Sequence, residues 1–415
     1  MKIAYILGQF PSLSETFILN QITGMIDLGH TVKIFALNRG DCTKVHSDIN
    51  KYQLLDSTYY FDIPYNKVMR IYKAIKIFLK HIYKYPEFIV KSLNFFKYKK
   101  LAISLRLLFY IEPFLKESFD IIHCHFGPIG SIGCYIKDII NFQKLIVSIH
   151  GYDITVYDVI LKEQYYHFLF KKSDLILSNT YFTKNKIVEL GCDAKKIIVH
   201  PVGLDIKRFH FKERKNGNLN KIKFLTIGRL VGKKGHKFSI EAFSKVLKKN
   251  NNIEYIIVGD GPLKGDLYKL ASILNLYSNI KFTASLIDEE CVKLYSKCQI
   301  FVLASITAKN GDMEGQGLVL QEAQACGMPV ISTFHNGIPE GVLNGKSGFL
   351  VPEKDVNALA EKMEYLINHS ELWPEIGRAG RRFVEEKYDI VKLNKRLEKI
   401  YEALINNNFS ELESL

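Results

Sequence analysis

Short apolar runs alternate with amphipathic segments along most of the chain. The first run, KIAYIL at 2–7, is followed by Gly8, a segment with one apolar face, Gly29 and a second run, TVKIFAL. A strand, a glycine turn, a helix and another strand in this order are typical of a doubly wound α/β domain. In such a domain, a turn at Gly8 lies at the carboxyl edge of the sheet, where ligands bind.

One polar and charged segment, 206–220, interrupts this alternation, and we interpret it as an interdomain linker. Residues 1–205 form the predicted N-terminal domain. The strand–turn–helix order then starts again, and residues 221–375 form a second predicted α/β domain. Residues 376–415 are predicted to be terminal helices. A chain of 415 residues is long enough for two domains with separate hydrophobic cores.

Residues 64–118 differ from the rest of the first domain and predict a basic amphipathic insertion. They contain twelve Lys or Arg and three acidic residues, interleaved with Tyr, Phe and Ile. A helical 4-3-4 spacing relates Ile71, Ile75, Phe78 and Ile82. The flanking basic residues are Lys73, Lys76, Lys80 and Lys84. This combination favours a helix lying on an anionic membrane. The alternative is an ordinary helix that packs its apolar face on the sheet and leaves its lysines in solvent.

The net charge of +14 at pH 7 indicates an anionic partner, such as nucleic acid, an anionic membrane or a phosphorylated substrate. The sequence has no zinc finger and no aromatic RNA-binding signature, so nucleic acid is not an expected partner. No run approaches the ~20 apolar residues of a membrane span. The start of the chain is interpreted as a strand rather than a signal peptide, and the seven cysteines form no C-x-x-C pair. The cysteine pattern indicates a reducing compartment.

The segment 310–329, NGDMEGQGLVLQEAQACGMP, has the clearest candidate chemistry. It begins as a glycine-rich loop and continues as a predicted helix from Leu318 to Ala325. A helix entered through glycines exposes unpaired amides that can cradle a phosphate. Glu314 and Glu322 flank this turn, and carboxylates accept hydrogen bonds from hydroxyl groups. Phosphate on amides and hydroxyls on carboxylates are what a nucleotide-sugar site requires.

The two glutamates are separated by seven residues and are followed by CGMPVI and later by GIPEGV. Together these resemble the E-x7-E signature of glycosyltransferase family 4. Other stretches resemble the same family in the expected order: PSLSETFI near the N-terminus, HGYD at 150–153 and GRLVGKKG from Gly228. PSLSETFI is similar to the N-terminus of bacterial members that build exopolysaccharides and capsules. Residues 41–118 match no motif of the family.

The resemblance implies an α/β protein with the GT-B fold, in which two Rossmann-like domains face a central cleft. It also implies a retaining hexosyltransferase that uses a nucleotide diphosphate sugar, expected to be a UDP-sugar. The acceptor implied is a hydroxyl of a saccharide linked to a polyprenyl pyrophosphate, in cell-surface polysaccharide biosynthesis. Such an enzyme is expected in the cytoplasm, peripheral on the inner face of the cell membrane.

The resemblance also assigns the site residues. Arg229 and Lys234 correspond to the clamp for the pyrophosphate, for which a guanidinium fork and an ammonium point charge are suited. His150 and Glu314 are expected to reach the donor sugar, and these four residues are the expected catalytic group. The other residues expected to bind the donor are Gly8, Gly261, Leu286, Gly317, Leu318 and Glu322. Asp153 is expected to orient His150 or to touch the acceptor.

No metal or cofactor is expected. The sequence contains no Asp-x-Asp to hold a divalent ion, and no third ligand follows His123 and His125 at a useful spacing. Three other functions are alternatives. A nucleotide-sugar epimerase would share the fold and the clamp, a Rossmann dehydrogenase lacks its G-x-G-x-x-G fingerprint here, and a non-catalytic assembly subunit would be expected to lose residues such as His150 or Lys234.

Overall fold

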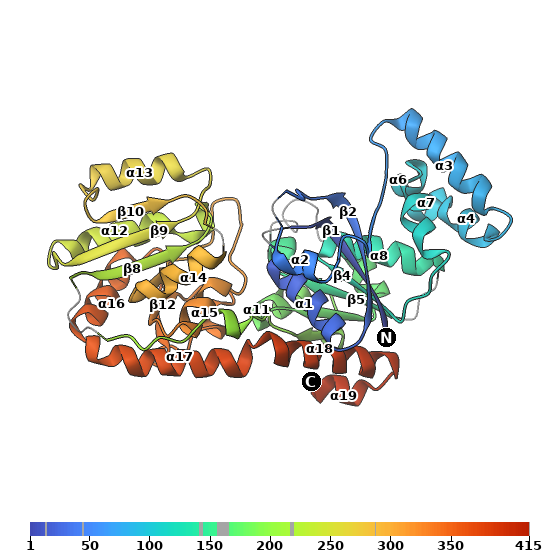
Figure 1. The fold of residues 1–415 in the computed structure, drawn as a ribbon. Helices are drawn as coiled ribbons and strands as arrows, with labels where there is room; N and C mark the ends of the chain where they lie inside the picture. Colours follow the sequence, from blue (N-terminus) through green and yellow to red (C-terminus); the bar gives the residue numbers. More distant parts are fainter. Residues whose placement is uncertain are drawn as a thin grey trace.

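Two α/β domains lie side by side in the computed structural model (Figure 1). The structure describes residues 1–12, 15–43, 45–140, 144–155, 166–215, 220–286 and 288–414. The predicted linker, 206–220, therefore lies partly outside the described residues. Within them the first sheet ends with Val199 and the second begins with Ile222.

The first sheet has seven parallel strands among the described residues, in the order β3-β2-β1-β4-β5-β6-β7. Their bounds are β1 Lys2–Phe10, β2 Thr31–Arg39, β3 Thr58–Tyr60, β4 Ile121–His125, β5 Lys144–Ile149, β6 Leu175–Ser178 and β7 Ile197–Val199. The prediction of a turn at Gly8 is wrong. Gly8 lies within β1, because pairing with β2 continues as far as Phe10 and Arg39.

Helices cover both faces of this sheet. They are α1 Thr16–Asp27, α2 Ser47–Lys51, α8 Gly127–Ile140, α10 His167–Lys172 and α11 Tyr181–Glu189. Apolar residues that alternate along the strands supply two cores. Ile6 and Cys124 face the core shared with α8, whereas Tyr5 and Leu7 face the core shared with α1.

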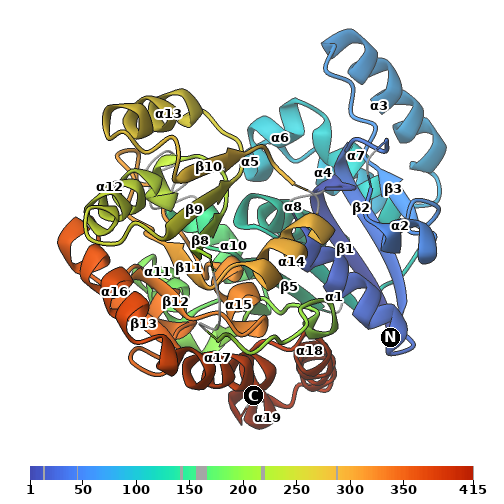
Figure 2. The same cartoon turned by 60° about the vertical axis from the view of Figure 1, so that its left-hand side comes forward.

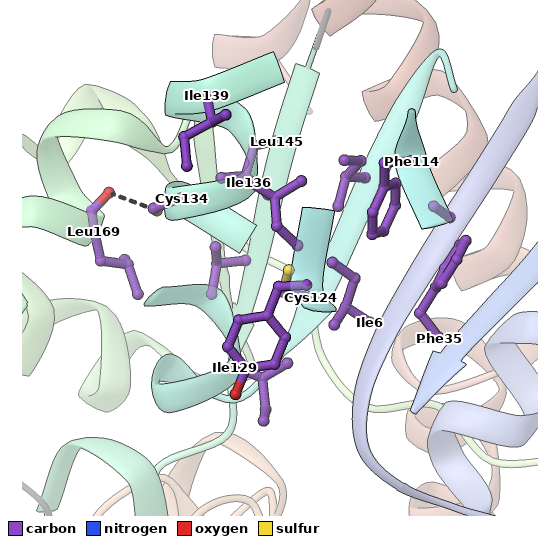
Figure 3. Close-up of a cluster of buried hydrophobic side chains, with 14 of the residues drawn as sticks. Ile6, Phe35, Phe114, Cys124, Ile129, Cys134, Ile136, Ile139, Leu145 and Leu169 are labelled. Carbon is purple, nitrogen blue, oxygen red and sulfur yellow. Dashed lines mark hydrogen bonds between the residues drawn. The ribbon is translucent and has the colours of Figure 1, made fainter. Parts of the chain in front are cut away.

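The basic insertion folds as a group of short helices at the outer edge of the N-terminal domain (Figures 1 and 2). They are α3 Lys67–His81, α4 Pro86–Ser92, α5 Phe95–Tyr98, α6 Lys100–Ile103 and α7 Arg106–Ile111. Phe114, which follows α7, stacks on Phe35 of β2 with ring centroids 4.3 Å apart. Figure 3 shows this pair beside Ile6 and Ile136 in the main core. The insertion is thus anchored in the sheet by its C-terminal end.

The burial of α3 differs in part from the predicted apolar face. The residues it buries are Arg70, Ala74, Ile77 and His81. Of the predicted stripe, Phe78 and Ile82 are half-buried, whereas Ile71 and Ile75 are exposed. The helix therefore packs one face and presents another apolar face to solvent. None of the helices in the described residues is both long and apolar enough to cross a bilayer.

The second sheet has six parallel strands in the described residues, in the order β10-β9-β8-β11-β12-β13. Their bounds are β8 Ile222–Ile227, β9 Ile253–Val258, β10 Ile280–Thr283, β11 Ile300–Leu303, β12 Val330–Thr333 and β13 Gly348–Val351. The covering helices are α12 His236–Leu247, α13 Lys264–Ile273, α14 Asp288–Lys297, α15 Leu318–Ala325 and α16 Val356–Asn368.

The C-terminal helices run along both domains (Figure 1). Helix α17, Trp373–Lys387, packs on α15 of the second domain, and α18, Ile390–Ile405, packs on α1 of the first. Helix α19, Phe409–Ser414, follows. Tyr401 of α18 is fully buried, and its hydroxyl lies 3.1 Å from the Tyr5 hydroxyl and 2.6 Å from His123 Nδ1. Hydrogen bonds of Tyr401 therefore connect α18 to the core of the first domain.

Candidate active site

A cavity of about 350 Å³ lies between the two domains. The first domain contributes Thr16, Phe17 and Asn20 of α1, and the connecting segment contributes residues between 203 and 209. The second domain contributes the carboxyl ends of β8 and β9 and parts of α14 and α15. Ligands of α/β sheets bind beyond the carboxyl ends of the strands, so this is the expected place for a site. Four predicted donor-binding residues line the cavity: Arg229, Leu286, Leu318 and Glu322.

Glu322 is fixed against the cavity wall by a tyrosine that the sequence analysis missed. Tyr295, fully buried on α14, donates its hydroxyl hydrogen to Glu322 Oε2 at 2.7 Å. Burial and the nearby carboxylate raise the pKa of the Tyr295 hydroxyl well above its ordinary value, so it remains a donor. One carboxylate oxygen is thus held in place by the protein.

The two predicted clamp residues follow β8. Arg229 is exposed at the cavity and makes no ion pair in the part of the chain that the structure describes. Lys234 ends a short 3-10 turn, Gly232–Lys234, and its side chain runs along Gly228, where a Cβ would lie 3.4 Å from Lys234 Cε. The next residue, Gly235, has φ +64° and no room for a Cβ, which would lie 1.7 Å from the Ala304 carbonyl oxygen. Only glycine allows this turn.

Lys234 is paired with Glu314. Its Nζ lies 2.5 Å from Glu314 Oε2, and both side chains are nearly buried. Burial acts to raise the pKa of the Glu314 carboxyl, but the charges of Lys234 and Lys233 outweigh it and hold that pKa below its ordinary value. Glu314 is therefore ionised at neutral pH. The pair places one positive and one negative charge beside the cavity in a fixed geometry.

Three further residues hold the loop that carries Glu314. Lys233 is buried, with its Nζ 3.0 Å from Asp312 Oδ1, and it donates to the Met313 carbonyl oxygen at 3.2 Å. The Glu314 amide donates to His335 Nε2 at 3.0 Å, and His335 Nδ1 in turn donates to Glu353 Oε1 at 2.5 Å. Of these three residues, only Lys233 lies in a stretch that the sequence analysis singled out, GRLVGKKG.

Glycines of this loop bring it against the first domain. A Cβ at Gly315 would lie 3.0 Å from the His150 carbonyl oxygen, and one at Gly337 would lie 2.5 Å from Thr180 Cγ2. Gln316 adds a reciprocal pair of 2.8 Å hydrogen bonds with the backbone of Val202. The glutamate loop and the carboxyl end of β5 are therefore neighbours across the interdomain cleft.

His150, at the end of β5, is held by a second histidine. Its Nε2 lies 3.0 Å from His125 Nδ1, and the two rings are stacked at 3°. Burial lowers the pKa of both imidazoles, that of His150 to about 3, so both are neutral at pH 7. His150 Nδ1 has no hydrogen-bond partner among the described residues. His125 is a positioning residue that the sequence analysis did not assign.

Three other predicted site residues lie away from the residues that line the cavity. The Asp153 carboxylate is buried and accepts hydrogen bonds from the Gly127 and His150 amides at 2.8 and 3.1 Å. Burial raises its pKa to about 6. It therefore holds the backbone of Gly127 and His150. Gly8 and Gly261 are not among the residues that line the described cavity, and neither are the predicted residues His150, Lys234, Glu314 and Gly317. Gly261 instead packs on Leu230, where a Cβ would lie 2.6 Å from its carbonyl oxygen.

Metal ligands are not clustered in the described residues, which contain no group of three or more His, Cys, Asp or Glu able to hold an ion. Both ring nitrogens of His123 are engaged, Nδ1 with Tyr401 and Nε2 with the Ser148 hydroxyl at 2.7 Å.

Gly317 has φ +72° and is the N-cap of α15. It provides the turn from which Leu318 and Glu322 reach the cavity wall.

Known proteins match the whole length of the chain. A family model described as "Glycosyltransferase Family 4" matches residues 14–208, and one described as "Glycosyl transferases group 1" matches residues 206–383. WcaL of Salmonella typhimurium, a glycosyltransferase assigned to colanic acid biosynthesis, is 33% identical over 414 residues, which cover 97% of this chain and 100% of WcaL. The chain belongs to glycosyltransferase family 4.

A second relative agrees with this membership, and solved structures share the fold. AmsK of Erwinia amylovora, an amylovoran biosynthesis glycosyltransferase, is 32% identical, and the match covers 97% of this chain and 100% of AmsK. HepE of Anabaena, solved in complex with UDP, has a TM-score of 0.75 at 16% identity, covering 97% of this chain and 100% of HepE. TarM has a TM-score of 0.70 at 15% identity, covering 97% and 99%. The GT-B fold predicted for this glycosyltransferase is confirmed.

The two domains of this family 4 glycosyltransferase are also joined by a glutamate. Glu340, in the GIPEGV stretch, accepts hydrogen bonds from the Tyr181 and Phe182 amides at the start of α11, at 2.8 and 2.9 Å. A carboxylate at a helix N-terminus pairs with exposed amides and a partial positive charge. The contact holds the second domain against the strand ends that carry His150.

Replacing Glu340 with alanine should loosen this junction locally. A hydrogen bond to a charged group contributes about 1.5–3 kcal/mol, so we expect the Tyr181 and Phe182 amides to exchange about 10- to 100-fold faster. Hydrogen-exchange mass spectrometry of the peptide that contains them measures this. Glu361→Ala, at an exposed position on α16, is the control. Unchanged exchange in Glu340→Ala would show that the junction does not depend on this carboxylate.

Proposed function

We propose that this glycosyltransferase moves a hexose from a nucleotide diphosphate sugar to a hydroxyl of a lipid-linked saccharide, with retention at the anomeric carbon. The observation that carries the proposal is the Lys234–Glu314 pair beside a cavity lined by Arg229 and Glu322. Two cations suit a diphosphate, and two fixed carboxylates suit hydroxyl groups. The site therefore has binding groups for the diphosphate and for the hydroxyls of such a donor.

Arg229 and Lys234 would stabilise the leaving diphosphate. Charge develops on that group as the bond to the sugar breaks, and preorganised cations lower the energy of such a transition state. Lys234 is already held by Glu314, so its charge is fixed before the donor binds. The amides at the start of α15 add a further partial positive charge. These cations and amides would therefore neutralise the charge on the diphosphate, which a divalent ion does in other enzymes. The proposal requires no metal or cofactor.

The carboxylates and His150 would orient the donor. Glu322, fixed by Tyr295, would accept hydrogen bonds from the ribose hydroxyls, and Glu314 would accept one from the sugar. His150 is neutral, and its Nδ1 has no partner in the described part of the protein. A neutral imidazole forms hydrogen bonds to a sugar hydroxyl without acting as an acid at pH 7. Its expected role is therefore positioning.

Retention would follow from attack on the face that the diphosphate leaves. The acceptor oxygen forms the new bond to the anomeric carbon as the bond to phosphate oxygen breaks. A phosphate oxygen takes the proton of the acceptor hydroxyl. This route needs no protein nucleophile, which agrees with the Glu314 carboxylate being engaged by Lys234.

The relatives support the finer parts of the proposal. HepE was solved with UDP, which favours a UDP-sugar as donor. WcaL and AmsK are named for colanic acid and amylovoran biosynthesis, which favours cell-surface polysaccharide as the product. Such saccharides are built on polyprenyl pyrophosphate, so we place the enzyme in the cytoplasm, peripheral on the inner face of the membrane. The net charge of +14 agrees with an anionic surface as a partner.

Two alternative functions predict different assay results. An epimerase would convert the nucleotide sugar without an acceptor, and a non-catalytic subunit would turn over no donor. Family 4 membership and the assembled cation–carboxylate group favour transfer over both. A panel of nucleotide sugars, assayed for slow hydrolysis and for thermal stabilisation of the protein, distinguishes the three.

The clamp gives a direct test. Arg229→Ala and Lys234→Ala should each lower the turnover of the donor by about 100-fold or more, the scale of removing one preorganised charge stabiliser. Lys248→Ala, at an exposed position in the same domain, is the control. Thermal melting checks folding, which matters for Lys234 because its loss leaves Glu314 unpaired. Near-normal turnover of Arg229→Ala would contradict the proposed clamp.

Chelation tests whether a metal takes part. We expect turnover to persist in excess EDTA, because the sequence has no Asp-x-Asp to hold a cation beside the diphosphate. Activity is measured with the same donor before and after chelation. Complete loss that magnesium or manganese restores would show that the site works with a metal ion.

The stereochemistry of the product tests retention. An α-linked donor should give an α-linked product, observed by proton NMR on the first product before any anomeric equilibration. A β-linked product would exclude the same-face route and leave the clamp and the fold untouched.

A further inference from the structure

Helix α3 has two faces with different environments. One face packs on α4 and α7 in a small core that contains Ala74, Ile77 and Phe109. The helix begins at a fixed point, because Asn66 accepts hydrogen bonds from the Val68 and Met69 amides. In both views α3 stands at the outer edge of the N-terminal domain, away from the C-terminal domain (Figures 1 and 2). The other face is therefore presented to the surroundings.

That outer face is apolar. Val68, Tyr72, Ile75 and Leu79 are 77%, 54%, 51% and 62% exposed. At about 100° per residue, these four lie within about 60° of arc, on the side opposite the buried face. Contiguous apolar surface of this kind on a soluble protein marks an interaction site, whereas isolated exposed apolar residues do not. We define these four residues as the apolar stripe.

Lysines border the apolar stripe. Lys76 lies along one side of it, and Lys84 follows the C-terminal end of α3. Neither forms an ion pair in the part of the chain that the structure describes, whereas Lys80 is paired with Glu112 at 2.8 Å. Between Lys67 and Lys116 the chain has twelve Lys or Arg and only two acidic residues. The occupant of this surface must therefore combine an apolar layer with negative charge.

We propose that the apolar stripe of α3 is the face on which this enzyme docks to an anionic phospholipid bilayer, with the stripe among the acyl chains and Lys76 and Lys84 at the headgroups. An apolar stripe with a lysine border on a helix of fifteen residues fits a helix lying in the plane of the membrane. A protein partner fits less well, because lysine is depleted from protein–protein interfaces. The proposal rests on the proposed function in that the acceptor is lipid-linked, and docking would bring the cleft to it.

Binding to vesicles tests the proposal with two pairs of variants. The stripe variant carries Val68→Ser and Leu79→Ser, and the charge variant carries Lys76→Glu and Lys84→Glu. Matched controls lie in the C-terminal domain: Ile273→Ser with Tyr277→Ser, which are 67% and 69% exposed, and Lys248→Glu with Lys269→Glu. All these positions are exposed, so the fold should be retained.

We expect the full-length protein to sediment with vesicles of phosphatidylglycerol and phosphatidylcholine in equal parts, and poorly with phosphatidylcholine alone. A lysine near an anionic surface contributes about fivefold to partitioning, so the charge variant should bind at least about 25-fold more weakly. The stripe variant should lose about tenfold or more, because two side chains no longer gain from leaving water. Both controls should bind as the wild type does.

Three outcomes would contradict the proposal that the apolar stripe is the docking face. They are a wild type that does not bind anionic vesicles, variants that bind as well as the wild type, and controls that lose binding equally. A dimer of the wild type that the stripe variant lacks, without vesicle binding, would assign the face to a second copy of the chain. Hydrolysis of the free donor is measured in parallel. Donor turnover without vesicle binding refutes only the docking, and vesicle binding without turnover of any donor refutes only the proposed function.

Discussion

The buried ion pair of Lys234 and Glu314 is the interaction on which the site depends. A charge removed from water is costly unless a partner and further hydrogen bonds compensate it, so each member requires the other. The surrounding loops supply that compensation. Gly235 allows the tight turn after Lys234, and Lys233 and His335 fix the segment that carries Glu314. The result is a preorganised charge arrangement, which is what a leaving diphosphate needs.

The two domains approach each other most closely where glycines of the second domain meet the strand ends of the first. Gly315 and Gly337 approach the ends of β5 and β6 too closely for a Cβ to fit freely, and Glu340 bonds to the first amides of α11. Helix α18 adds a second connection, since Tyr401 is bonded to Tyr5 and His123 in the core of the first domain. His150 is thereby held beside the glutamate loop, although it belongs to the other domain.

The insertion shows why an amphipathic pattern alone does not assign a buried face. Of the predicted 4-3-4 stripe, Ile71 and Ile75 point to solvent and Phe78 and Ile82 are half-buried, whereas the buried face includes Arg70 and His81. Their polar atoms are satisfied within the fold, Arg70 by the Pro64 carbonyl oxygen and His81 by Glu112. Burial of charged residues is tolerated when such partners exist. The apolar residues left outside are the ones available to a membrane.

The sequence alone determined the two α/β domains, the glutamate loop and the basic insertion, because strand–turn–helix order, glycine positions and charge are local properties of the chain. It also led to Arg229, Glu314 and Glu322 through a resemblance that family membership confirmed. The tertiary structure decided which distant groups meet: His125 with His150, Tyr295 with Glu322, and Asp153 with the Gly127 amide. Local patterns do not determine these contacts, because they depend on how separate strands and helices pack around two cores.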